Sequence, residues 1–390
     1  MLNEKKVEHI ELFYDLIFVY CICKLTALLA PMTEHFTDFS PLPVYFVLFL
    51  TLLQIWTFTT FLINRYGYRH MADYLCIFVN MFFLFYMADG IRDGWGGSTF
   101  LRFHAAWVLI LVNLGIQFAW KLHKHVCMDG LDEKIIRRYM AILFTESLLA
   151  AFTVPLYLTT GIDLTVVPLT AGAVMTALSN KLFSRRPVAF GHLAERVSLL
   201  IVVTFGEMVV AISRYFTASA EPYFGFVVFL IVFGMFLIYL FDYYNYRDES
   251  VKTAGIGYVV LNIPLIFGIN NATMALEAMP ESTSGTWPET VYLILSLAVF
   301  LASFRGLALY HKPEFRGKET DKRYLQMAVP ALLVLLGAAM LLVHAQPRIC
   351  AALAVVLMYG VLALRWLFFR ANTKEQRIAA FCEIRPRYDE

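Results

Sequence analysis

The sequence is poor in charged residues. Asp, Glu, Lys and Arg make up only 16% of its 390 residues, whereas soluble domains carry about 25%. The 32 Lys and Arg nearly balance the 30 Asp and Glu, so the chain lacks the basic excess that is typical of nucleic-acid-binding proteins. Hydrophobic residues reach 59%, which is incompatible with intrinsic disorder. The composition therefore argues against a soluble domain, a nucleic-acid-binding protein and a disordered chain.

Cysteine pairs and catalytic motifs are also missing. The six cysteines form no CxxC pair, so we expect neither a disulfide framework nor a zinc site. No GxSxG, HExxH or GxxxxGK[ST] pattern occurs, and the mixed-charge start predicts no cleavable signal peptide. We therefore expect no metal, no cofactor and no enzyme activity. An enzyme would have to use intramembrane residues such as His192, Glu195 and Glu207.

Long apolar runs dominate instead. Stretches of about 17 to 22 residues recur along the chain, each long enough to cross a hydrocarbon core of about 30 Å. They lie roughly at 12–30, 43–63, 72–89, 104–120, 140–158, 164–182, 197–213, 224–242, 255–276, 290–308, 324–344 and 349–369. We therefore predict an all-α integral membrane protein with about twelve transmembrane helices.

The basic residues predict its orientation. With the N-terminus inside, 26 Lys and Arg fall in inner loops and tails and 4 in outer loops. Cytoplasmic loops carry such an excess, so we expect a multi-pass protein of the cell membrane with both termini in the cytoplasm. Similar residues also recur at a shift of 183, which places His9 on His192 and Lys24 on Glu207. We predict two tandem six-helix repeats, 1–183 and 188–390, joined by a basic cytoplasmic linker, 184–187.

Two segments carry ionisable residues at unusual depth. Lys24 in the first predicted helix and Glu207 in the seventh lie about 15 to 18 Å into the membrane by helical rise. Buried charges there need a partner, so we expect an ion pair, which either serves transport or merely locks the two repeats together. Glu146, in the fifth helix, is either a carrier carboxylate or the partner of an arginine such as Arg305.

A second polar group is expected near the inner face. Glu11 and Asp15 are one helical turn apart, and His192 and Arg196 lie at a matching depth. This group either fixes helix orientation or has a function, and we favour the first. Arg365 is close enough to the inner boundary to snorkel. The candidate residues for transport or another function are Lys24, Glu207, Asp15, Glu11, His192, Glu195, Arg196, His9 and Glu146.

The same two segments resemble a known family. Glu11–Val19 is similar to the E-L-F-[FY]-D-L-[IV]-F-V opening of the low temperature requirement protein A family of bacterial membrane proteins. His192, Glu195, Arg196, Gly206 and Glu207 fit its H-x-x-E-R-x-x-L-x-[IV]-[IV]-x-x-x-G-E stretch. The resemblance implies a polytopic membrane protein, and the family's length suits the whole chain. The family name refers to growth in the cold and implies little chemistry, and Lys24 departs from the neutral polar residue expected at its position.

The duplicated plan also resembles the potassium channels that carry an R-x-x-x-F-S-D motif. Here the pattern reads His9-x-x-x-Phe13-Tyr14-Asp15, and the second half lacks Phe-x-Asp, so only a related fold is implied. Our leading expectation is passage of a small ion or solute between the two halves. The alternatives are a non-transporting protein of stress response, cold adaptation or sensing and, third, a membrane-embedded enzyme. We expect the lipid bilayer, and a small cation or a proton, as partners; the sequence is also compatible with a homo-oligomer.

Overall fold

The structure is a computed structural model of the full chain. It describes residues 7–29, 32, 38–68, 70–91, 96–124, 129–217, 222–279, 287–313, 315 and 327–383, and the side chains of these residues up to 371.

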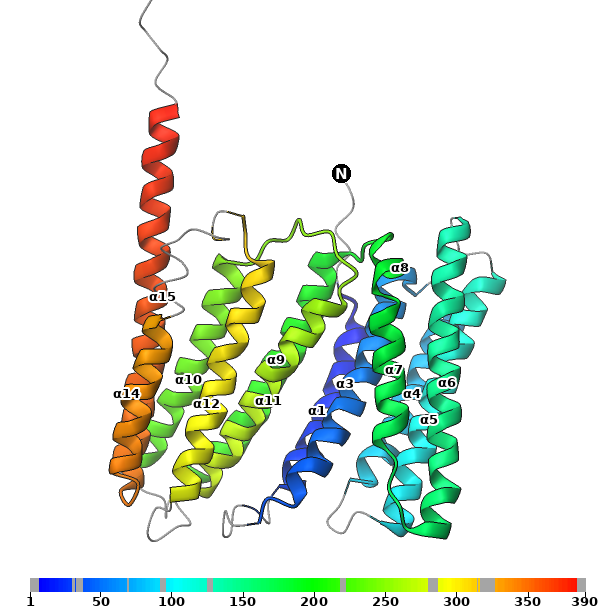
Figure 1. The fold of residues 1–390 in the computed structure, drawn as a ribbon, viewed down its shortest axis with the longest axis horizontal. Coiled ribbons are helices and arrows are strands. Elements are labelled where there is room, and N and C mark those ends of the chain that lie inside the picture. Colours follow the sequence, from blue (N-terminus) through cyan, green and yellow to red (C-terminus); the bar gives the residue numbers. More distant parts are fainter. Residues whose placement is uncertain are drawn as a thin grey trace, which may run out of the picture. The chain divides into compact units, whose positions relative to one another are not determined.

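Helices account for nearly all of the described chain (Figure 1). Within these residues the only strand-like pairing is one isolated bridge, between Arg247 and His311. The helices are α1 (His9–Leu28), α3 (Pro41–Tyr66), α4 (Met71–Asp89), α5 (Gly97–His123), α6 (Gly130–Thr160), α7 (Val166–Leu178), α8 (Asn180–Ser184), α9 (Phe190–Ile212), α10 (Pro222–Asn245), α11 (Ile256–Ala278), α12 (Trp287–Leu307), α14 (Val329–Leu342) and α15 (Pro347–Glu383), with the short 3-10 helices η1 (Ser213–Phe216) and η2 (Ala308–Tyr310). The predicted all-α class is confirmed.

Each of the twelve predicted apolar stretches overlaps a helix. Among the described residues, nine helices are long and apolar enough to cross a membrane. The other three overlapping helices are α1, α7 and α14. The 20-residue α1 is long enough but carries three charged residues, whereas α7 and α14 have only 13 and 14 residues, fewer than the about 20 that a span needs.

The outer surface is apolar as well. Large side chains that the fold leaves exposed include Phe82 on α4, Leu148 on α6 and Val210 on α9, with exposed fractions of 56%, 72% and 71%. Such a surface would aggregate in water, but it suits contact with lipid tails, which are themselves apolar. The helices and their surface together identify a multi-pass membrane protein.

The chain forms two compact units. Unit 1 contains residues 1–207 and 249–266, and unit 2 contains residues 208–248 and 267–390. In unit 1, α5 packs on α4 and α6, α7 packs on α6 and α3, and α1 packs on α3 and α4. In unit 2, α10 and α14 pack on α15, and α12 packs on α14. The predicted duplication about the 184–187 linker stays a prediction.

The segment before α11 helps to position the start of α9. The Val188 backbone N–H donates to the Thr253 carbonyl at 3.0 Å. Gly255 follows with a φ of +86°, and a Cβ atom there would lie 2.5 Å from the Leu193 side chain. Both the positive φ and the close approach require glycine. This contact holds the first turn of α9 within unit 1.

The basic linker is tied to the start of α6. Arg186 forms ion pairs with Asp129 at 3.1 Å and with Asp132 at 3.0 Å. Asp129 also caps α6, because its carboxylate accepts the Leu131 and Asp132 backbone N–H groups, each at 3.0 Å. The Asp132 N–H is the main cause that lowers the pKa of Asp129, and Arg186 adds to it. The linker is therefore held by specific contacts.

Candidate functional site

The site begins with two acidic residues at the start of α1. Glu11 and Asp15 are four residues apart, so they lie on one face of the helix. That face turns inward: Glu11 has no exposed surface and Asp15 has 1%. By helical rise they lie about 3 and 9 Å from the first residue of α1. Two carboxyl groups this deeply buried need donors from other helices.

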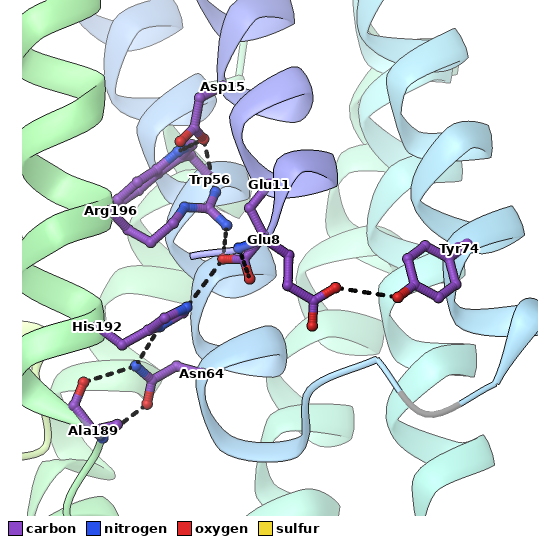
Figure 2. Close-up of polar contacts among 9 residues, drawn as sticks. All are labelled: Glu8, Glu11, Asp15, Trp56, Asn64, Tyr74, Ala189, His192 and Arg196. Atoms are coloured by element: carbon purple, nitrogen blue, oxygen red, sulfur yellow. Dashed lines mark hydrogen bonds and ion pairs between the residues drawn. The ribbon is translucent and has the colours of Figure 1, made fainter. Parts of the chain in front are cut away.

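Arg196 of α9 supplies those donors (Figure 2). Its Nη1 lies 2.5 Å from Glu11 Oε2, and its Nη2 lies 2.7 Å from Asp15 Oδ1. The arginine itself is completely buried. Because the guanidinium is planar and always charged, it holds both carboxyl groups at once in a fixed geometry. The structure thus brings together the acids of α1 and the arginine of α9, as their matching depth predicts.

A third helix, α3, closes the site. Trp56 donates its indole N–H to Asp15 Oδ1 at 2.8 Å, and its ring lies 5.7 Å from the Arg196 guanidinium. One turn further along α3, the Thr59 hydroxyl meets the Tyr14 hydroxyl at 2.9 Å. Sequence reasoning missed Trp56. The only available signal was that a buried indole N–H requires an acceptor.

The ring of His192 is held in place by Asn64 of α3. The Asn64 side chain pairs with the Ala189 backbone: Oδ1 accepts the Ala189 N–H, and Nδ2 donates to the Ala189 carbonyl, each at 3.0 Å. The same Nδ2 lies 3.1 Å from His192 Nδ1, so the amide holds the imidazole ring in place beside α3.

His192 Nε2 lies 3.2 Å from Glu11 Oε2 (Figure 2). The group thus contains two carboxyl groups, one guanidinium and one imidazole. We call Glu11, Asp15, His192 and Arg196 the acid–arginine cluster. With a neutral imidazole, it carries one net negative charge when both carboxyl groups are ionised, and none when one of them holds a proton. A buried site of this kind is suited to bind a proton or to attract a small cation.

The cluster also has unused polar capacity. Among the described residues, neither Asp15 Oδ2 nor Arg196 Nε has a hydrogen-bond partner. Buried polar atoms in native proteins are nearly always paired, and intramembrane ionisable residues commonly mark functional sites. The cluster therefore does two things: it ties α1, α3 and α9 together, and it keeps a carboxylate oxygen available.

The expected pair between Lys24 and Glu207 does not form. In the described part of the chain Lys24 has no ion pair; its side chain is exposed, and its ammonium lies 5.6 Å from the Tyr20 ring centroid. The helix α1 ends at Leu28. Lys24 is four residues from that end, or about 6 Å, so its side chain can reach the interface. Glu207 is half-buried and lies beside Cys23.

This arrangement predicts a negligible coupling between the two charges. The variants Lys24→Met and Glu207→Gln should change the free energy of unfolding additively, because no ion pair joins the two residues and independent residues couple by less than about 0.5 kcal/mol. Thermal unfolding of both single variants and the double variant in detergent measures this coupling. A double variant that is clearly more stable than the sum of the two single effects predicts would show that the two residues do form an ion pair.

The remaining candidates lie apart from the cluster. His9 and Glu195 are exposed, although each stands next to or within one turn of a cluster residue in sequence. Helical phase explains this, because adjacent residues point about 100° apart. Glu146 is completely buried, but its neighbours are Gln54 of α3 and Gly172 of α7. It forms a separate site.

Unit 2 contains an ion cluster of its own, which the sequence did not predict. Arg365 of α15 lies 2.8 Å from Asp242 Oδ1 of α10, and His311 Nε2 lies 3.3 Å from Asp242 Oδ2. The Arg365 guanidinium also stacks 4.4 Å from the Phe304 ring centroid of α12. The side chains of Asp242 and Arg365 are 9% and 4% exposed. Arg365 therefore does not snorkel but joins the helices of unit 2.

The comparisons with known proteins agree with the sequence motifs. No curated protein matches the chain. The family model described as bacterial low temperature requirement A protein (LtrA) matches residues 6–376, nearly the whole chain. The match includes both motif segments, the acid–arginine cluster between them and the ion cluster of unit 2. The chain therefore belongs to the bacterial low temperature requirement A family.

Proposed function

We propose that this LtrA family protein passes a proton or another small cation across the membrane, with the acid–arginine cluster as its site. The observation that carries the proposal is the charge of the cluster. Two carboxyl groups, those of Glu11 and Asp15, share the single guanidinium of Arg196, so the ionised acids exceed the one fixed positive charge. A buried site with a net negative charge favours a cation, and a proton is the smallest ligand that neutralises it.

The proposal includes a membrane topology. We propose twelve spans in the cell membrane, with α1, α7 and α14 added to the nine long apolar helices, and both termini in the cytoplasm. The distribution of Lys and Arg among the loops supports this orientation. We further propose two tandem repeats and a transport role without enzyme activity. In this arrangement the acid–arginine cluster lies near the cytoplasmic ends of α1 and α9.

Burial supports a second candidate function. The side chains of Glu11, Asp15, His192 and Arg196 are at most 1% exposed, which a purely structural lock also requires. In that case the protein adapts or senses the membrane during stress without transport. A transport protein in an occluded conformation has the same closed site, so the two candidates differ in flux and not in this geometry.

A flux measurement separates the two candidates. Purified protein is placed in liposomes that contain a pH-sensitive dye, and a potassium diffusion potential drives protons inward. We expect faster acidification than in empty liposomes. The triple variant Glu11→Gln, Asp15→Asn, Arg196→Met should lose this flux, because it has no charge left to attract the ion.

The same triple variant provides the control for folding. It leaves no stranded charge, so its thermal unfolding should remain close to that of the wild type. Transport is refuted if liposomes with the wild-type protein acidify no faster than empty ones and also take up sodium and potassium ions no faster than empty ones. A triple variant that transports normally would place the pathway elsewhere.

A further inference from the structure

A second buried carboxyl group, Glu146, lies away from the acid–arginine cluster. It stands sixteen residues into the 31-residue helix α6, about 24 Å from the first residue and therefore near the middle of the helix. Its exposed fraction is 0%. In the described part of unit 1 no charged side chain contacts it. A carboxyl group without a counter-charge at this depth requires an explanation.

The polar neighbours of Glu146 come from two helices. Gln54 of α3 donates its Nε2 to Glu146 Oε2 at 3.2 Å, and the Trp107 indole of α5 lies beside the carboxyl group. Among the described residues, three buried atoms of this group lack a hydrogen-bond partner: Glu146 Oε1, Gln54 Oε1 and Trp107 Nε1. The site therefore holds two unpaired oxygens and one unpaired N–H.

A fourth helix is shaped to admit the carboxyl group. A Cβ atom on Gly172 of α7 would lie 1.9 Å from Glu146 Oε2 and 2.5 Å from Gln54 Nε2. A side chain at this position would displace the Glu146 carboxyl group and the Gln54 amide, so the glycine leaves the space that these two groups occupy. Residues of α3, α5, α6 and α7 together enclose Glu146, which makes this a built site.

The hydrogen-bond donors around Glu146 favour a proton over a metal cation as the ligand of this site. A metal cation would need several oxygen ligands, but here the Gln54 amide donates to the carboxyl group and an indole lies beside it. A proton on Glu146 Oε1 turns that atom into a donor, and Gln54 Oε1 is an acceptor without a partner, while Gln54 Nε2 keeps its bond to Oε2. The protonated acid then offers the amide one donor and one acceptor, and the amide offers one of each in return. The ionised acid has no donor to offer.

We propose that Glu146 is a proton-binding site, occupied at neutral pH and completed by Gln54, Trp107 and Gly172. The charged and titratable groups of the acid–arginine cluster lie on the other side of α3: Trp56 contacts Asp15, whereas Gln54, two residues earlier, contacts Glu146. The inference concerns a different carboxyl group from the proposed function and does not depend on transport.

Infrared spectroscopy of the whole protein tests this site, because protonated and ionised carboxyl groups absorb at separate frequencies. Wild-type protein with ¹³C-labelled glutamate at pH 7 should show one protonated glutamate that shifts with the label, although a glutamate in water, with a pKa of about 4.3, is ionised there. Glu146→Gln should remove that band. Glu195→Gln, which changes an exposed glutamate, should leave it unchanged.

Further variants keep the test decisive if Glu146→Gln does not fold. Gln54→Leu and Trp107→Phe should shift the band, because each removes a neighbour of the acid. Gly172→Ala should shift it too, whereas Gly130→Ala on α6, whose Cβ meets nothing within 4 Å, should not. Absence of a protonated glutamate band in the wild type overturns the proposal. So does a band that Glu146→Gln leaves undiminished, or one that sodium or potassium ions remove.

Discussion

Replacing Arg196 with methionine should strongly destabilise unit 1. The substitution leaves Glu11 and Asp15 buried, with exposed fractions of 0% and 1%, and without their positive partner. Loss of one side of a buried ion pair commonly costs about 3–5 kcal/mol, and here two carboxyl groups depend on the same guanidinium. We expect a large fall in folded yield, measured by size-exclusion chromatography, and in the midpoint of thermal unfolding in detergent.

Two controls isolate the cause of this loss. Arg137→Met removes an arginine that is 65% exposed and paired with Glu133 one turn away on α6; such surface pairs contribute about 0–1 kcal/mol, so stability should barely change. Adding Glu11→Gln and Asp15→Asn to Arg196→Met should restore most of the stability. If Arg196→Met unfolds at the wild-type temperature, the cluster does not hold unit 1 together.

The second large effect is expected in unit 2. Asp242→Asn should destabilise this unit by about 3–5 kcal/mol, because the buried guanidinium of Arg365 then lacks a carboxylate. His311 cannot compensate, since it contributes no negative charge. The thermal midpoint of the purified variant in detergent measures this effect.

Again the double variant is informative. Asp242→Asn combined with Arg365→Met removes both charges and should be more stable than Asp242→Asn alone, although Met cannot fully replace the packing of Arg365 on Phe304. Arg305→Met, at an exposed position of α12, serves as the matched control. Equal losses for Arg305→Met and Asp242→Asn would show that burial of the Asp242–Arg365 pair has no special importance.

Sequence periodicity was sufficient to predict the helices and part of the acid–arginine cluster. Each predicted apolar stretch overlaps a helix, because length and hydrophobicity are local properties of the chain. The four-residue spacing of Glu11 and Asp15 places them on one face of α1, and this follows from helix geometry alone. Arg196 could be matched to them only by depth.

The partners of the buried charges could not be predicted from position along the helices. Lys24 and Glu207 were matched by depth and by an assumed repeat, but depth along a helix does not specify the direction of a side chain around it. Lys24 lies on the exposed side of α1, where a long side chain near the helix end can reach water. Arg365 shows the opposite case: its position near a boundary permitted snorkelling, but Asp242 of α10 faces it.

What the sequence determined by itself was the class of the protein: an all-helical membrane protein of the LtrA family, whose first and seventh predicted helices carry the conspicuous charges. Only the tertiary structure decided which charges meet, that Asn64 holds the ring of His192, and that Gly172 makes room for Glu146. These contacts join residues up to 185 positions apart, such as Glu11 and Arg196. The physical reason is that helix formation depends on neighbours in sequence, whereas the partner of a buried polar group is chosen by how the helices pack.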